Sequence, residues 1–257
     1  MFFGFDLKEL FYFPFKDAEA RKHLLIGTVV SLSAFIIPIL PYFVLTGYAI
    51  QLVRQVFRGE APRMVAWDNW GDLLKDGLKV FGIRLIYTSP IILLMLPLMV
   101  TSILLPVITG NSSSPEADPF FAVFMGIFAL TMCLIVPISI VSAFVIPAAE
   151  MHVVETGEFS AGFRIREWWA IFRANLGGFI AAFAIYYLAA MAIAIVTQIL
   201  MITVILSCLI PIVLPASTIY IMLIMYVTIA QAYRDGKAKL AQQSEAQPTM
   251  DPVFQHP

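Results

Sequence analysis

The stretch "FIIPILPYF", residues 35–43, places Pro38 and Pro41 in the middle of the first long apolar run, residues 24–53. Proline lacks the backbone N–H of a helical hydrogen bond and clashes with the preceding turn, so it breaks or kinks a helix. Each arm of the run, about 15 residues, would rise about 22 Å, less than the roughly 30 Å of a bilayer's hydrocarbon core. Whether this run crosses the membrane or enters it and turns back decides the topology of the whole chain.

The composition is that of an integral membrane protein. Hydrophobic residues make up 60% of the chain and charged residues 13%, more apolar surface than a soluble domain can bury. Four stretches carry no charged side chain: 24–53, 85–115, 119–149 and 174–233. The last is long enough for two spans with a turn between them. The runs are continuous and do not alternate, which predicts helices rather than a β-barrel.

The basic residues predict which side of the membrane each connection occupies. The 16 Lys and Arg residues lie before the first apolar run, between the first and second, between the third and fourth, and after the last. Connections 109–119 and 204–211 contain none. Basic flanks stay in the cytoplasm, so both termini are predicted to be cytoplasmic. Both flanks of the first run are basic, which favours a re-entrant hairpin broken at Pro38 and Pro41; a kinked fifth span is the alternative.

We therefore expect an all-α polytopic protein with four full spans, an N-terminal re-entrant hairpin and cytoplasmic interfacial helices. The predicted segments are an interfacial segment 1–23, the hairpin 24–57, an interfacial helix plus span 66–108, a span 119–156, an interfacial helix plus span 163–203, a span 207–235 and a disordered cytoplasmic tail 240–257.

Two cytoplasmic connections match at a fixed offset of 98 residues, which suggests an internal duplication. Gly59-Glu60 matches Gly157-Glu158, and Trp70 matches Trp168. Chance similarity between two interfacial connectors is the alternative. Tryptophan rings favour the headgroup level of a bilayer, so the predicted interfacial anchors are Trp67, Trp70, Trp168 and Trp169. Glycine supplies the left-handed residue that ends many helices, and the predicted helix stops are Gly59, Gly157 and Gly236.

A longer stretch carries a resemblance to a known family. Residues 47–79, "GYAIQLVRQVFRGEAPRMVAWDNWGDLLKDGLK", are followed by "IYTSPIILL" (86–94) and later by "AQAYRDG" (230–236). With these motifs the chain resembles the domain of unknown function 4013 family, uncharacterised prokaryotic multi-pass membrane proteins. The resemblance covers most of residues 1–236 and implies a multi-helix protein of a prokaryotic cytoplasmic (inner) membrane. It implies no catalytic residues.

Few residues suggest chemistry. No phosphate-binding glycine loop, zinc-helix motif or nucleophile elbow appears in the sequence. His152 lies near Glu150 and Glu155, where a metal or proton-relay role competes with a simple solvated helix end. Arg84 directly precedes the second apolar run, about two turns inside the predicted helix if that helix starts near Leu78. It is either paired with Glu150 or extended to the cytoplasmic interface. We expect no cofactor and no metal.

The sequence favours a non-catalytic role. We expect a scaffold or complex subunit that contacts the lipid bilayer and other membrane proteins or further copies of itself. A small transporter or channel for a neutral or lipid-like solute is the alternative, because broken helices and duplications occur in transporters. An enzyme that uses Glu150, His152 and Glu155 is a third reading. The net charge of −1 does not point to nucleic acid.

Overall fold

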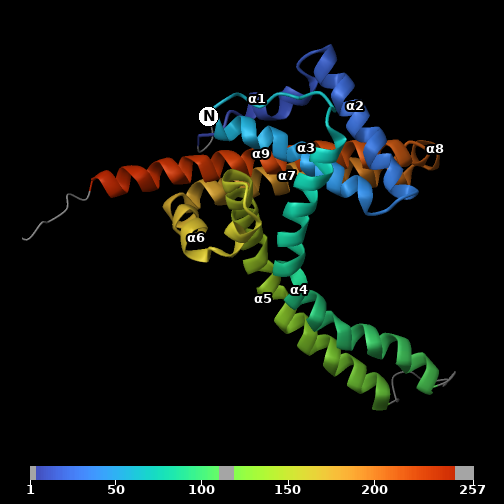
Figure 1. Ribbon diagram of the computed structural model, residues 1–257. Helices are drawn as coiled ribbons and strands as arrows, with labels where there is room; N and C mark the ends of the chain where they lie inside the picture. Colours follow the sequence, from blue (N-terminus) through green and yellow to red (C-terminus); the bar gives the residue numbers. More distant parts are fainter. Residues whose placement is uncertain (1–3, 110–118, 247–257) are drawn as a thin grey trace, which may run out of the picture. The chain divides into compact units, whose positions relative to one another are not determined.

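The computed structural model describes residues 4–109 and 119–246 (Figure 1). This part of the chain is helical and contains no β-strand. The helices are α1 (Leu7–Tyr12), α2 (Ala18–Leu32), α3 (Leu40–Phe57), α4 (Trp70–Thr109), α5 (Pro119–Thr156), α6 (Ile165–Ala174), α7 (Leu176–Ile202), α8 (Val204–Ser207) and α9 (Ile210–Glu245). Short 3₁₀ turns cover Phe13–Phe15, Ser33–Phe35 and Phe159–Phe163.

Four helices are long and apolar enough to cross a bilayer. They span Trp70–Leu104 in α4, Phe121–Thr156 in α5, Leu176–Ile202 in α7 and Ile210–Glu245 in α9. Each exceeds the roughly 20 residues that a crossing needs. The described helices are therefore those of a membrane protein.

The chain divides into two compact units. The first contains Met1–Phe81 and Ala148–Pro257, and the second contains Gly82–Pro147. Helices α4 and α5 each pass from one unit into the other.

The first unit is built around α9. Helices α2, α3, α6 and α7 all contact α9, which runs through this unit in Figure 1. Leu223 and Val227 of α9, Leu52 of α3 and Ala182 of α7 are completely buried. Burial of these apolar side chains supplies the main driving force for packing.

The first apolar run folds as two helices rather than one. Helix α2 ends at Leu32, a 3₁₀ turn follows, and α3 begins at Leu40 with Pro41 in its first turn. Proline suits this position because the first turn of a helix needs no N–H donor. The two helices contact each other, and at the turn between them Phe35 is 73% and Ile36 83% exposed. The entry of this turn into the bilayer stays a prediction.

The N-terminal segment packs against the protein. Leu10 of α1 is buried together with Phe5 and Phe13. The Tyr220 hydroxyl of α9 donates to the Phe11 carbonyl at 3.1 Å. The location of residues 1–23 at the membrane surface stays a prediction.

The interfacial helix predicted from residue 66 is absent from the described structure. Residues 61–69 are not helical, and α4 begins at Trp70 and continues to Thr109. The start of α4 lies directly against α3, because Gly47 and Gly77 leave room for the facing backbone. A Cβ on Gly47 would lie 1.8 Å from the Leu73 carbonyl oxygen, and one on Gly77 would lie 1.8 Å from that of Phe43. This helix start packs on α3, and its position at a membrane surface stays a prediction.

The three predicted glycine stops behave differently. Gly59 follows α3 with φ of +77°, and Gly157 follows α5 with φ of +75°. Gly59 N donates to Val56 O and Glu60 N to Gln55 O, the bond pair of a Schellman motif. The prediction for Gly236 is wrong, because α9 continues through it to Glu245. Gly236 instead allows α6 to pack closely against α9, because a Cβ there would lie 2.7 Å from the Ile171 carbonyl oxygen.

The extension of α9 also corrects the predicted tail. Residues 240–245 are helical rather than disordered. Ala, Leu and Gln, which form helices readily, fill most of this stretch. Residues 247–257 lie outside the described part of the chain.

The second unit contains the remaining parts of α4 and α5. Proline lies within α4 at Pro90, where it removes the donor for the Ile86 carbonyl. The Ser89 hydroxyl donates to that carbonyl at 2.7 Å. Side-chain donors of this kind allow a membrane helix to continue through proline.

Candidate functional site

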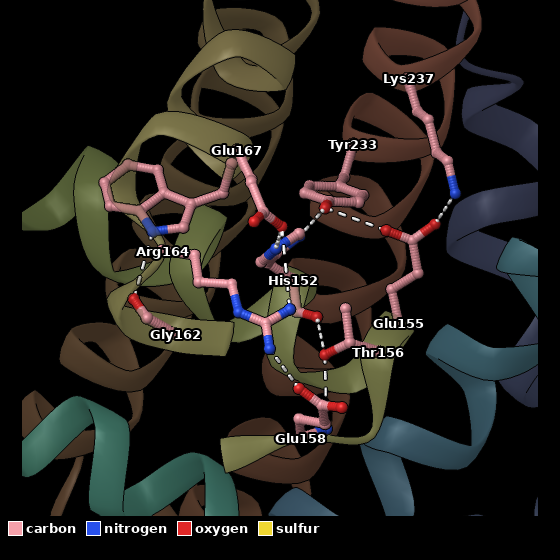
Figure 2. A network of polar contacts seen from close by, with 10 residues as sticks. His152, Glu155, Thr156, Glu158, Gly162, Arg164, Glu167, Tyr233 and Lys237 are labelled. Atoms are coloured by element: carbon pink, nitrogen blue, oxygen red, sulfur yellow. Dashed lines mark hydrogen bonds and ion pairs between the residues drawn. The ribbon is translucent and has the colours of Figure 1, made fainter. Parts of the chain in front are cut away.

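A connected group of polar side chains lies where the end of α5, the start of α6 and the C-terminal part of α9 meet (Figure 2). It contains His152 and Glu155 of α5, Glu167 of α6, and Tyr233 and Lys237 of α9. We call these five residues the polar cluster. His152 is only 5% exposed, so its setting is not the solvated helix end that the sequence left open.

His152 bonds through both ring nitrogens. Its Nδ1 lies 2.7 Å from the Tyr233 hydroxyl, and its Nε2 lies 3.0 Å from Glu167 Oε2. The Tyr233 hydroxyl also lies 3.0 Å from Glu155 Oε2. Lys237 forms an ion pair with the other Glu155 oxygen. Figure 2 shows these groups in a continuous row.

The three hydrogen bonds of the row Glu167–His152–Tyr233–Glu155 require one proton more than a neutral imidazole and a phenol supply. Three hydrogen bonds require three protons, whereas a neutral imidazole brings one and a phenol brings one. An ionised carboxylate brings none. The row is complete when an additional proton resides on His152, on Glu155 or on Glu167. Chemically, the polar cluster can hold a proton inside the first unit.

Neighbouring contacts hold the loop between α5 and α6 in place. The Thr156 hydroxyl donates to the His152 carbonyl at 2.9 Å, and Glu158 N donates to that hydroxyl at 3.3 Å. Arg164 pairs with Glu158 at 2.5 Å. Lys79 Nζ donates to the Gly157 carbonyl at 2.9 Å. The loop is thereby tied to α4 and to the end of α5.

Glu150 lies two residues before His152 in α5. Its side chain is buried, and the Tyr226 hydroxyl donates to its Oε2 at 3.4 Å. Arg84, the predicted partner of Glu150, belongs to the second unit. The Arg84–Glu150 pair stays a prediction.

A metal site is not evident in the part of the chain that the structure describes. Within residues 4–109 and 119–246, no three His, Cys, Asp or Glu side chains converge as metal ligands do. The two His152 nitrogens are already engaged by Tyr233 and Glu167.

Two of the four predicted tryptophan anchors belong to the protein core. Trp67 is buried and stacks on Tyr48 with ring centroids 3.9 Å apart, while its Nε1 donates to the His23 carbonyl at 2.9 Å. Trp168 is 1% exposed and donates to the Gly162 carbonyl at 3.1 Å. The anchor prediction is wrong for both, because each indole N–H has a protein partner. Trp70 and Trp169 are exposed, and their role as anchors stays a prediction.

The sequence did not identify Glu167, Tyr233, Lys237 and Asn175. Asn175 joins α6 to α9: its Nδ2 donates to the Ala232 carbonyl at 2.9 Å, and Lys239 Nζ donates to its Oδ1 at 2.6 Å. Tyr233 and Lys237 are four residues apart and so share a face of α9. That spacing was readable, but nothing in it points to a partner on α5.

Comparison with known proteins places the chain in a family. The family model described as "Protein of unknown function (DUF4013)" matches residues 30–205, more than half of the chain. Neither the comparison with curated proteins nor that with solved structures gave a match. The matched region runs from α2 to α8 and includes the break between α2 and α3. The chain belongs to the DUF4013 family, whose function is unknown.

Proposed function

We propose that this protein is a non-catalytic membrane scaffold or complex subunit, which acts through contacts with lipid and with other membrane proteins. One observation carries the proposal. In the most apolar stretches of α4 and α5 only 6% of the residues are buried, against 44% in α9.

The exposed side chains of α4 and α5 are large and apolar. They include Leu93, Met99 and Ile103 of α4, and Leu130, Ile140 and Val141 of α5. Such surfaces are covered by lipid tails or by the helices of a partner. A unit of two helices leaves most of its surface available for this purpose.

The polar cluster supports a structural role. His152 has a partner at each ring nitrogen, and Glu155 has one at each carboxylate oxygen. These contacts join the consecutive helices α5 and α6 to α9, which is distant from them in sequence. The cluster then acts as a fixed attachment of α6 and α9 to α5.

Photo-crosslinking tests the proposal in living cells. A benzophenone amino acid is placed singly at Leu93, Leu130 and Ile140, and at Ile195 of α7 as an exposed apolar control. We expect protein adducts of defined mass from the α4 and α5 positions and not from Ile195. Adducts at twice the mass of the chain identify a second copy, and other masses identify a different subunit. Lipid adducts alone at all four positions would contradict the scaffold role.

A small transporter or channel for a neutral or lipid-like solute is the second candidate. Two grooves flank α9 near Pro215, one of about 270 Å³ lined by Ser31 and Phe35 and one of about 310 Å³ lined by Thr197 and Gln198. Neither has an ionisable lining residue, which suits an uncharged solute. Solute uptake by proteoliposomes that is lost in a Phe35→Trp variant would support this candidate, and equal permeability of empty liposomes would exclude it.

The orientation and location follow the same proposal. The basic connections favour cytoplasmic termini, and the proposed location is the inner membrane of a prokaryote. Cysteine labelling, described below, tests this arrangement.

A further inference from the structure

Helix α6 has an outward face that the polar cluster does not use. Glu167 turns toward His152, and Trp168 is buried, whereas Arg166, Trp169 and Arg173 are exposed. Positions three, four and seven apart share one side of a helix. The two arginines therefore lie on the same side as Trp169.

This face forms one wall of a groove with a volume of about 510 Å³. The opposite wall is the end of α9, which contributes Leu240 and Gln243. The two helices that form the walls approach closely at Gly236, where a Cβ would lie 2.7 Å from the Ile171 carbonyl oxygen. A groove of this size lies in the range of small-molecule sites.

The charge in the groove is uncompensated. Its lining residues are Arg166, Trp169, Ala170, Arg173, Ala174, Leu240 and Gln243, which include two cations and no carboxylate. In the part of the chain that the structure describes, Arg166 and Arg173 form no ion pair. The nearby basic side chains are engaged elsewhere: Arg164 with Glu158, and Lys237 with Glu155. Two guanidinium groups that share an open groove are suited to phosphate oxygens.

The groove adjoins the apolar part of the chain. Arg173 is three residues before Leu176, the first residue of the apolar helix α7. The apolar side chains of Ile165, Trp169 and Leu176 are exposed as well. Trp169 stacks on Phe172, with ring centroids 5.3 Å apart, which fixes its indole at the groove wall. Tryptophan beside basic residues is typical of the headgroup level of a bilayer.

We propose that the groove between α6 and the end of α9 binds the phosphate headgroup of an anionic phospholipid. Arg166 and Arg173 contact the phosphate oxygens, Gln243 donates to the headgroup, and Trp169 and Leu240 contact its apolar part. The adjoining apolar surface favours a lipid over a soluble phosphate. The inference rests on the membrane location of the chain and not on the scaffold role, so either can fail alone.

Native mass spectrometry of the full-length protein in detergent tests the inference. The probes are phosphatidylglycerol and phosphatidylcholine with identical acyl chains, and the readout is the affinity of the first bound lipid. We expect wild-type protein to prefer phosphatidylglycerol. The double variant R166Q/R173Q should bind it about 25-fold more weakly, since each basic residue at an anionic surface contributes about a fivefold change. Its affinity for phosphatidylcholine should stay unchanged.

A matched control separates the groove from general charge. The variant R21Q/R63Q removes two exposed arginines outside the groove and lowers the net charge equally. Equal losses in the two variants would overturn the proposal. Glycerol phosphate at millimolar concentration provides a second arm, and displacement of the lipid by it at comparable affinity would assign the groove to a soluble phosphate instead. Melting curves of both variants verify that they are folded.

Discussion

The contact between α3 and α4 depends on two residues without side chains. A Cβ at Gly77 would lie 1.8 Å from the Phe43 carbonyl oxygen, a backbone atom that cannot rotate away. We expect Gly77→Ala to force the helices apart and to reduce the free energy of unfolding by about 3 kcal/mol, the upper part of the usual range for overpacking. The midpoint of thermal unfolding of the purified protein measures this effect.

Gly71→Ala is the matched control for that change. Gly71 also lies in α4, but a Cβ there would meet nothing within 4 Å. Alanine is the better helix former, so we expect this variant to be as stable as the wild type or more stable by up to about 1 kcal/mol. Equal destabilisation by the two substitutions would show that the close approach is not the cause.

At the scale of the element, α6 has two faces with different tasks. Trp168 fills the core and Trp169, 41% exposed, faces outward. We expect Trp168→Ala to reduce the free energy of unfolding by about 3–5 kcal/mol, through lost burial and a cavity. Trp169→Ala should change it by less than about 1 kcal/mol, as surface substitutions usually do.

Thermal unfolding of the two variants compares neighbouring residues of identical type. If Trp169→Ala were the more damaging, the assignment of inward and outward faces of α6 would be reversed. The groove described above would then be part of the core.

At the scale of the whole molecule, topology is the property to measure first. After Cys133→Ser and Cys208→Ser, single cysteines at Lys16, Ser113 and Ser244 report their side of the membrane to an impermeant thiol reagent in intact cells. We expect labelling at position 113 alone, because the connection 109–119 contains no basic residue. Labelling at position 16 as well would make residues 24–53 a crossing segment.

Several features were predictable because they depend on local sequence. Charge-free runs predict the membrane helices, since only self-bonded backbone is stable in lipid. Four helices of the required length and hydropathy are present, and α5 has the predicted bounds 119–156. Prolines predict interruptions, and α3 begins beside Pro41. The family was likewise recognisable from motifs in residues 47–79.

Other features depend on which helices meet. A glycine after a helical run predicts the end of a helix. Gly236, however, lies inside α9, where α6 packs against it. Tryptophan in an amphipathic stretch reads as a membrane anchor, yet Trp67 and Trp168 find carbonyl partners within the protein.

The sequence by itself determined that this is a helical membrane protein, where its apolar helices lie and to which family it belongs. Hydropathy, proline and glycine act on the conformation of a few neighbouring residues, so the positions of the membrane helices can be predicted from the sequence. The tertiary structure alone decided that His152, Glu167 and Tyr233 form one row, and that Arg166 and Arg173 face Leu240 across a groove. Those arrangements arise from contacts between different helices, and the spacing of residues within one helix carries no information about its neighbour.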